Sequence, residues 1–198
     1  EPYGTRTHIF NITDLDNVTY QGFYEAESPS IDHNLYTLDQ FIYESNYRSG
    51  VRVLDAIRVG SSVLSEVAFF DLFPENDNAQ FSGTWSNYPY LPSGLVLATS
   101  MYDGFFIMKP TIITTSQDSW DLCSTDDVVF EIDINANLAF PLTVGLDGLG
   151  GASASAAVIN NQGVATVTIT GISTLAPGNY SPNLLLISNF GEQYEIPL

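Results

Sequence analysis

The stretch RVLDAIRVGSSVLSEVAFF, residues 52–70, decides the fold, because HIFNITDLDNVTYQGFY, residues 8–24, repeats its pattern. In both stretches an apolar strand ends in Asn or Asp, a polar turn follows, and a second strand ends in aromatic residues. Asn11 and Asp55 occupy matching positions. A repeat of about 40–55 residues that consists of strands is typical of β-propeller blades.

A third, shorter copy is GFFIMKP, residues 104–110, which places Lys109 at the position of Asp55. The segments between the copies contain strand pairs, which we expect to be the inner strands of four-stranded blades. Residues 1–110 therefore account for two to three blades, whereas a closed ring needs at least ~4. We expect upstream sequence or a separate chain to supply the rest of the propeller, and a chain that begins at Glu1 to be a piece of a longer protein.

The whole chain is predicted to be all-β. Its apolar residues alternate or form short runs bounded by Gly, Pro, Asn and Asp, and no apolar run is long enough to span a membrane. The runs expected to contain strands include THIFNI, VRVLDAI, SEVAFFDLF, GLVLATS, GFFIMKP, DVVFEIDI, GVATVTITGI and SPNLLLIS.

The composition changes at Lys109-Pro110. All Lys and Arg residues lie before this point, and a Pro there ends the preceding strand. Two domains are predicted: residues 1–110, the last blades of a propeller, and residues 111–198, which have the size and strand pattern of an Ig-like or fibronectin-III-like β-sandwich.

The charge is strongly negative, with 23 Asp and Glu against 5 Lys and Arg and a net charge of −18. Such a surface repels nucleic acid and anionic membranes, attracts cations such as Ca²⁺, and keeps an exported protein soluble. The single cysteine, Cys123, excludes an intrachain disulfide and a cysteine-based zinc cluster, and we expect it to be a small buried apolar residue.

Asp32 and His33 form the first candidate site. A carboxylate beside an imidazole suits a general base, a metal ligand or ligand binding, but no nucleophile motif such as G-x-S-x-G accompanies them. The alternative is a hydrogen-bond network that ties neighbouring strands together.

Arg48 and Arg52 flank the turn at Gly50 and form the second candidate site. Their guanidinium groups could bind an anionic ligand at the propeller mouth. The alternative is structural, with salt bridges and aromatic stacking. The expected partners are Asp32, Glu44 and Asp55 for pairing, and Tyr43 and Tyr47 for stacking.

Two acidic segments are candidate Ca²⁺ sites, because carboxylate and amide oxygens are the ligands that this ion prefers. They are residues 73–81, with Glu75, Asn76, Asp77 and Asn78, and residues 118–127, with Asp118, Asp121, Asp126 and Asp127. The first segment lacks EF-hand spacing, and Asx turns explain the same residues; for the second segment the alternative is a solvated loop.

The aromatic residues Trp85, Tyr88, Tyr90 and Tyr102 could form a platform on which sugars stack, which makes a glycan a candidate partner. The alternative is that they pack between blades, since the sequence pattern does not separate the two arrangements.

The order of motifs in residues 1–110 resembles the end of the LVIVD-repeat β-propeller of choice-of-anchor B proteins, and residues 111–198 resemble a bacterial Ig-like module. The first resemblance implies export, attachment to the cell surface through a C-terminal anchor, and in related proteins a type IX secretion sorting domain; it implies no catalytic residues. The matching segments are IDHNLY (31–36), SNYRSGVRVLD (45–55), FPENDN (73–78), WSNYPY (85–90), PSGLVLATSMYDGFFIMKP (92–110), WDLCSTDDVVFEIDI (120–134), FPLTVGLDGL (140–149) and LAPGNYSPNLLLIS (175–188).

The leading functional prediction is a non-enzymatic bacterial protein, extracellular or on the cell surface, that acts as a scaffold or interaction module and is stiffened by Ca²⁺. Its expected partners are the rest of the propeller and the secretion or surface-attachment machinery. Two alternatives stay open: the accessory C-terminal region of a secreted hydrolase whose active site lies upstream, and a carbohydrate-binding adhesin.

Overall fold

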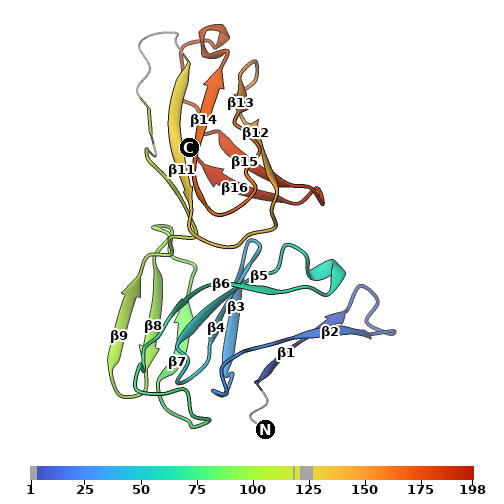
Figure 1. The fold of residues 1–198 in the computed structure, drawn as a ribbon, viewed down its shortest axis with the longest axis vertical. Coiled ribbons are helices and arrows are strands. Elements are labelled where there is room, and N and C mark those ends of the chain that lie inside the picture. The colour runs from blue at the N-terminus through green and yellow to red at the C-terminus, as the bar shows by residue number, and fades with distance from the viewer. Residues whose placement is uncertain (1–3, 118, 121–126) are drawn as a thin grey trace. The chain divides into compact units, whose positions relative to one another are not determined.

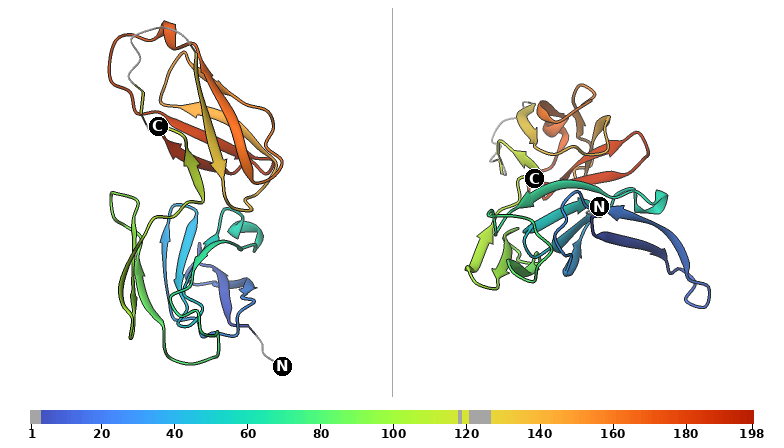
Figure 2. Two further views of the ribbon diagram at one scale, coloured as in Figure 1. Left: turned by 60° about the vertical axis from the view of Figure 1, so that its left-hand side comes forward. Right: turned by 60° about the horizontal axis from the view of Figure 1, so that its bottom comes forward.

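The computed structural model describes residues 4–117, 119–120 and 127–198, and its regular structure consists of antiparallel sheets joined by turns, with two short 3-10 segments (Figures 1 and 2). No sheet closes into a barrel or a propeller within the described residues. The chain divides into two compact units, Glu1–Pro110 and Thr111–Leu198, at the position where the composition changes. No helix in the described part of the chain is long and apolar enough to cross a membrane.

The first unit contains three sheets in sequence order. A two-stranded hairpin comes first, a four-stranded meander follows, and a three-stranded meander ends the unit; neighbours in each sheet are consecutive in the chain. The strands are β1 (Arg6–Asn11) and β2 (Thr19–Glu25), then β3 (Asn34–Leu38), β4 (Phe41–Ser45), β5 (Val51–Asp55) and β6 (Ser65–Phe70), then β7 (Thr84–Tyr88), β8 (Val96–Ser100) and β9 (Gly104–Met108).

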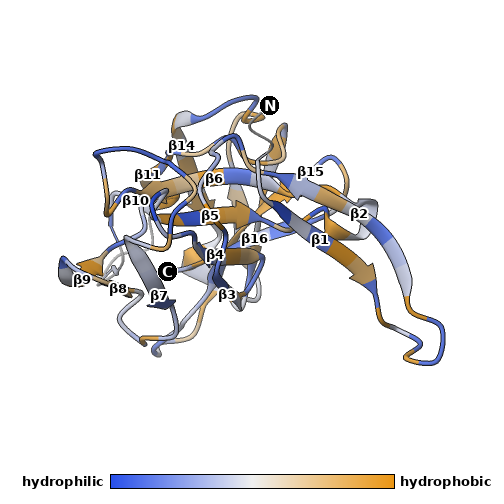
Figure 3. Cartoon of the chain, turned by 90° about the horizontal axis from the view of Figure 1, so that it is seen from below, coloured by the Kyte–Doolittle hydropathy of each residue, from blue (hydrophilic) through white to orange (hydrophobic). Residues whose placement is uncertain are grey.

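Strand β5 is covered on both faces, because its side chains alternate between two hydrophobic clusters. Leu54 packs with Ile9 of the hairpin and Leu64, and Val51 packs with Leu72 and Ala98 on the other side. Figure 3 shows hydrophobic stretches on β1, β5 and β9. Each of the three sheets therefore packs against the next through alternate residues of these strands.

The turn between β4 and β5 needs glycine at Gly50. Its φ is +85°, and an added Cβ would collide with the carbonyl oxygen of Phe70 on β6. Tyr47, in the same turn, accepts a hydrogen bond from the backbone N–H of Thr84 at 2.8 Å and so holds β7 near this turn.

The second unit contains two antiparallel sheets. One is β10-β11-β14-β13 and the other is β12-β15-β16. Strands β11 and β15 alternate between buried and more exposed side chains, as expected when one face of each sheet is covered. The bounds are β10 (Ile113–Thr115), β11 (Val128–Ile134), β12 (Leu142–Asp147), β13 (Ser153–Ser155), β14 (Gly163–Thr170), β15 (Asn183–Ser188) and β16 (Gln193–Pro197).

The prediction that the chain is all-β is confirmed, and each apolar run named above contains a strand. The turns at Asp39-Gln40 and Ser49-Gly50 also lie where the alternation of apolar residues ends. The propeller and Ig-like assignments stay predictions, because the described sheets do not close into a ring.

Candidate functional site

A polar cavity of about 390 Å³ lies where the end of the β1–β2 hairpin meets the four-stranded sheet. The chain leaving β2 lines one side with Tyr24–Ser28, and strands β4, β5 and β6 line the other. We call this the polar cavity. The residues on this second side are Glu44, Arg52 and Glu66 of the strands and Asn46 and Ser49 of the turn between β4 and β5.

Glu44 is the most buried charged residue of the polar cavity. Its Oε1 accepts a hydrogen bond from Thr7 Oγ1 at 2.7 Å, and its Oε2 accepts one from Asn46 Nδ2 at 3.0 Å. Burial raises the pKa of the Glu44 carboxyl, and these two hydrogen bonds oppose the shift; Asp32 and Glu66 raise the pKa further.

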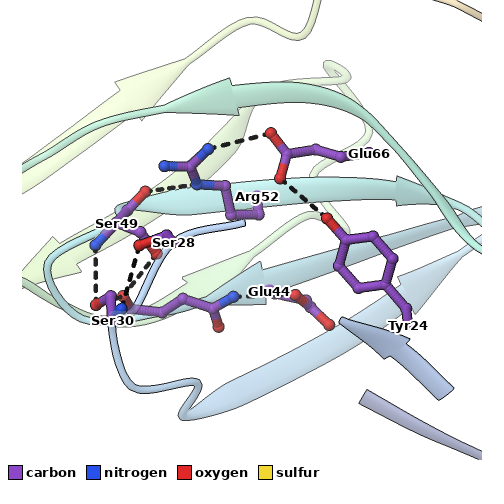
Figure 4. Close-up of polar contacts among 8 residues, drawn as sticks. Tyr24, Ser28, Ser30, Glu44, Ser49, Arg52 and Glu66 are labelled. Carbon is purple, nitrogen blue, oxygen red and sulfur yellow. Dashed lines mark hydrogen bonds and ion pairs between the residues drawn. The ribbon is translucent and has the colours of Figure 1, made fainter. Parts of the chain in front are cut away.

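Arg52 faces the same cavity and is held by three contacts, of which Figure 4 shows those with Glu66 and Ser49. Its Nη1 lies 3.1 Å from Glu66 Oε1, its Nε donates to the carbonyl of Ser49 at 2.8 Å, and its guanidinium lies 4.7 Å from the ring centre of Phe69. The partners expected from the sequence were wrong. Glu44 is opposite Arg52 in register, but its oxygens are held by neutral donors, and Glu66 takes the ion pair.

Tyr24 completes the ring of polar groups, since its hydroxyl donates to Glu66 Oε2 at 3.4 Å (Figure 4). Burial raises the pKa of the Tyr24 hydroxyl, and the nearby negative charges of Glu66 and Glu44 act in the same direction. Tyr24 therefore acts at neutral pH as a hydrogen-bond donor or acceptor and not as a charged group.

The turn between β4 and β5, which contributes Asn46 and Ser49 to the polar cavity, is held by hydrogen bonds to Ser30. The buried Ser30 hydroxyl donates to the carbonyl of Asn46 at 2.8 Å and accepts from the backbone N–H of Ser49 at 3.1 Å (Figure 4). One end of the Asn46 amide is hydrogen-bonded and the other is not: its Nδ2 donates to Glu44, whereas its buried Oδ1 has no hydrogen-bond partner among the described residues. This turn fixes the positions of Asn46 and Ser49 relative to strand β4.

Glu44→Gln is expected to change how stability depends on pH. The folded protein holds the Glu44 proton more tightly than the unfolded chain, so the free energy of unfolding falls as pH rises above the ordinary glutamate value of 4.5. Removing the carboxyl removes this fall. Urea unfolding between pH 4 and pH 8 should give a flatter profile for Glu44→Gln, whereas the exposed control Glu75→Gln keeps the wild-type slope; equal slopes in all three proteins contradict the prediction.

Asp32 and His33 directly precede β3 in the chain, and their side chains lie in different surroundings. Burial raises the pKa of the Asp32 carboxyl, opposed by a hydrogen bond from Thr5. His33 Nδ1 lies 3.3 Å from the hydroxyl of Tyr47, and the imidazole packs against the rings of Tyr47 and Trp85, with centres 4.7 and 4.5 Å away. These contacts fit the strand-tying alternative, and a ligand role for the pair stays a prediction.

Arg48 holds the loop between β6 and β7. Its Nε donates to Ser82 Oγ at 2.6 Å, its Nη1 to Asn76 Oδ1 at 2.5 Å and its Nη2 to Gln80 Oε1 at 2.6 Å. The guanidinium also lies over the ring of Phe73, 4.6 Å from its centre. The carboxylate partners and tyrosine stacking expected for Arg48 were therefore wrong. Neutral oxygens of one loop accept the hydrogen bonds of its guanidinium group, and the ring it stacks on is that of Phe73.

The loop that Arg48 holds contains Glu75, Asn76, Asp77 and Asn78, which the sequence predicted as Ca²⁺ ligands, and the contacts of Arg48 oppose that prediction. Asn76 Oδ1 already accepts from Arg48 and from the backbone N–H of Asn78 at 3.1 Å, so a cation there would have to displace a guanidinium. Within residues 4–117, 119–120 and 127–198, no three His, Cys, Asp or Glu residues stand close enough to hold a metal ion. Of the second segment Asp127 is described and exposed, and Asp118, Asp121, Asp126 and also Cys123 lie outside the described residues.

Arg48→Ala is expected to destabilise the first unit and open the loop of residues 73–82. It removes three hydrogen bonds and a cation–π contact, for a loss of about 1–3 kcal/mol. Urea unfolding and limited proteolysis should both report the change. The control is Arg6→Ala, which removes an exposed ion pair with Glu25 and an exposed cation–π contact with Phe23 and should cost less than about 1 kcal/mol, because solvent screens both. Equal losses in the two variants would show that the loop does not depend on Arg48.

Three of the four candidate sugar-binding aromatics, Trp85, Tyr88 and Tyr90, fall into two clusters among the described residues. Trp85 contacts His33 and Tyr47, and Phe81 contacts Tyr47. Tyr88 and Tyr90 form a separate edge-to-face pair with ring centres 5.4 Å apart. Trp85, Tyr88, Tyr90 and Tyr102 are all exposed. The single platform expected from the sequence is therefore divided, and the sugar-binding role stays a prediction.

Sequence reasoning included Arg52 but missed the other members of the polar cavity. Glu44 entered only as a pairing partner, and Tyr24, Asn46 and Glu66 were not considered. One signal was available, because the two successive antiparallel strands β4 and β5 place Glu44 opposite Arg52. The contribution of the hairpin had no such signal, since Thr7 reaches Glu44 from a different sheet.

Comparisons with known proteins give little further information. The chain matches no protein-family model, and no curated protein matches it. Among solved structures it matches the crystal structure of domains 4 and 5 of the S-layer protein SbsC, with a TM-score of 0.30 and 16% sequence identity. The match covers 52% of this chain and 63% of that chain, so this chain spans less than two thirds of that structure. At this TM-score the match carries no inference about fold or function.

Proposed function

We propose that the chain is part of a non-enzymatic exported protein of the choice-of-anchor B type, in which Glu1–Pro110 contributes the last blades of an LVIVD-type propeller and Thr111–Leu198 is an Ig-like module. Its function is that of a scaffold. The first unit has two end faces, the outer face of the hairpin with Phe10 and the outer face of β9 with Ile107, and each receives a neighbouring sheet built on the same repeat. The proposal rests on the exposure of equivalent repeat positions.

The repeat aligns Phe10 with Leu54 and Val53 with Ile107. In the middle sheet, which has a neighbour on each side, Leu54 is 0% and Val53 is 5% exposed. At the ends of the unit, Phe10 is 54% and Ile107 is 63% exposed. The same repeat position is buried where a neighbouring sheet is present and open at the end faces.

These open faces carry several exposed apolar and aromatic side chains. On the hairpin they include Phe10, Tyr20 and Phe23, and on β9 they include Phe105 and Ile107. Contiguous exposed apolar side chains mark interaction surfaces or aggregation-prone ones. A sheet of the same repeat supplies a face of matching pattern, since the packing of the hairpin on the middle sheet already shows how one repeat packs on the next.

Thiol labelling tests whether neighbouring sheets cover the two end faces in the native protein. Phe10→Cys and Ile107→Cys, in a Cys123→Ser background, should react with a maleimide at least tenfold more slowly in the protein made by its native host than in the isolated 198-residue chain. Leu15→Cys, in the exposed turn of the hairpin, should react equally fast in both. If all three thiols react equally fast in the native protein, no neighbouring sheet covers these faces.

The surface location needs its own test. A protease that does not enter intact cells of the native host should remove the protein from the cell fraction, or the protein should appear in the medium, while a cytoplasmic marker stays intact. Full protection until the cells are lysed contradicts export.

A second candidate function, carbohydrate binding, is supported by the exposed Trp85 ring that packs against His33. A glycan array should then show binding that Trp85→Ala abolishes and Tyr102→Ala retains, with both variants folded by circular dichroism. An array without binding removes this candidate.

A further inference from the structure

The polar cavity holds more negative charge than its own residues neutralise. Four carboxylates line it (Glu25, Glu27, Glu44 and Glu66), and Arg52 is the one cation of the lining. Glu25 is paired with Arg6, which lies outside the lining, so Glu27 and Glu44 are the carboxylates for which no ion pair is found among the described residues. The positive charge of Arg52 is already used by Glu66. Because charges removed from water need a partner, a cavity with this lining favours a positively charged ligand over a neutral or anionic one.

The buried part of the polar cavity offers acceptors without matching donors. Glu44 is 2% exposed, and none of the described residues places a cationic group within salt-bridge distance of it; its two oxygens accept from the neutral groups Thr7 Oγ1 and Asn46 Nδ2. A carboxylate has about four lone-pair sites, so two of them stay open. Asn46 is also 2% exposed, lines the cavity, and has an Oδ1 that accepts no hydrogen bond. The missing component is a hydrogen-bond donor.

We propose that the polar cavity binds an organic cation through a primary ammonium group, which donates to Glu44 and to the Oδ1 of Asn46. An ammonium carries three donors and one positive charge, and it therefore satisfies both needs at once. A metal ion fits less well, because no three His, Cys, Asp or Glu residues in the described part of the chain are close enough to hold one. The volume of about 390 Å³ lies within the range of small-molecule sites, about 300–1,000 Å³.

This site goes beyond the proposed scaffold function and does not depend on it. All its residues come from the hairpin and the four-stranded sheet, whose contact is present in the first unit itself. The end faces that would receive further sheets lie on the opposite side of the hairpin and on β9. A chain that lacks further blades should therefore still bind the amine.

The ammonium could belong to a free diamine or to a lysine side chain of another protein. Two probes distinguish these sources: 1,5-diaminopentane and Nα-acetyl-lysine amide, titrated into the 198-residue chain by calorimetry at pH 7.5. Saturable binding of either probe supports the site, and the tighter one identifies the source. The Nε-acetylated form of the second probe, which lacks the charge, should not bind.

Glu44→Gln should weaken binding by at least tenfold, since a charge-assisted hydrogen bond contributes about 1.5–3 kcal/mol, which equals about 10- to 100-fold. The variant is expected to fold, because the Gln oxygen can still accept from Thr7 and a rotated Asn46 amide can accept from the Gln nitrogen. Glu66→Gln, at a partly exposed position of the same cavity, provides a second variant with a smaller loss.

The matched control is Glu75→Gln, which removes the same charge from an exposed loop outside the cavity. It should leave the dissociation constant within about twofold, as expected for an exposed charge whose field is screened. Equal weakening by Glu44→Gln and Glu75→Gln would mean that amines associate with the acidic surface at large, and no saturable heat for either probe would mean that the cavity holds water only. Either result overturns the proposal.

Discussion

Leu54→Ala is expected to lower the free energy of unfolding of the first unit by about 2–5 kcal/mol, among the largest effects of any single substitution in this unit. Leu54 is fully buried at the centre of the cluster that joins the hairpin to the four-stranded sheet. Removing its side chain leaves a cavity between two sheets that the strands cannot close without breaking the hydrogen bonds of β5 with β4 and β6.

Urea unfolding followed by tryptophan fluorescence measures this loss, in a Trp120→Phe background so that Trp85 reports the first unit alone. The matched control is Leu35→Ala on β3, where the same side chain is exposed and its loss should cost less than about 1 kcal/mol. If the two variants lose equal stability, the cluster around Leu54 does not hold the hairpin on the sheet. We also expect Leu54→Ala to bind 1,5-diaminopentane more weakly in the calorimetric titration, because the polar cavity is formed by these two sheets.

The strands of this chain could be predicted from sequence because their signals are local. In VRVLD the alternation of side chains identifies two faces, and Gly50 marks the turn before it, which the positive φ and the close approach of Phe70 require. The two-residue period of a strand places Arg52 and Leu54 on one face of β5 and Val51 and Val53 on the other. These inferences need only a period of two and the position of a turn.

The partners of the charged side chains could not be predicted in the same way. Arg48 was expected to pair with a carboxylate, because the chain has many of them, but it binds three neutral oxygens of residues 76–82. Which loop folds back over a side chain depends on the path of the chain between strands, which the period of a strand does not contain. Arg52 shows the same limit within a sheet: register places Glu44 opposite it, and hydrogen bonds from Thr7 and Asn46 decide that Glu66 takes the pair.

The buried carboxyl of Glu44 connects the stability of the first unit with its proposed ligand. Burial raises the pKa of this carboxyl, so the ionised form destabilises the folded state at neutral pH. A bound ammonium would reverse that effect by pairing the charge and filling the open acceptor sites. We therefore expect saturating 1,5-diaminopentane to raise the stability of the wild-type chain more than that of Glu44→Gln, by the linkage between binding and unfolding.

Tyr194→Ala is expected to unfold the second unit or to cost it about 3–5 kcal/mol, the loss typical of large aromatic residues in cores. Tyr194 on β16 is fully buried, and it is the largest fully buried side chain among the described residues. Its hydroxyl accepts a hydrogen bond from the backbone N–H of Ala139 at 3.0 Å, so it joins the sheet β12-β15-β16 to the segment that precedes β12.

Two further variants separate the ring of Tyr194 from its hydroxyl. Tyr194→Phe keeps the ring but leaves the buried N–H of Ala139 without its partner, and it should cost about 1–3 kcal/mol. Tyr180→Ala, at an exposed tyrosine of the same unit, should cost less than about 1 kcal/mol. Urea unfolding in a Trp85→Phe background, with Trp120 as the probe, measures all three variants. The expected order of loss is Tyr194→Ala, then Tyr194→Phe, then Tyr180→Ala; a Tyr194→Phe variant as stable as the wild type would mean that the ring alone, and not its bond to Ala139, holds this part of the unit together.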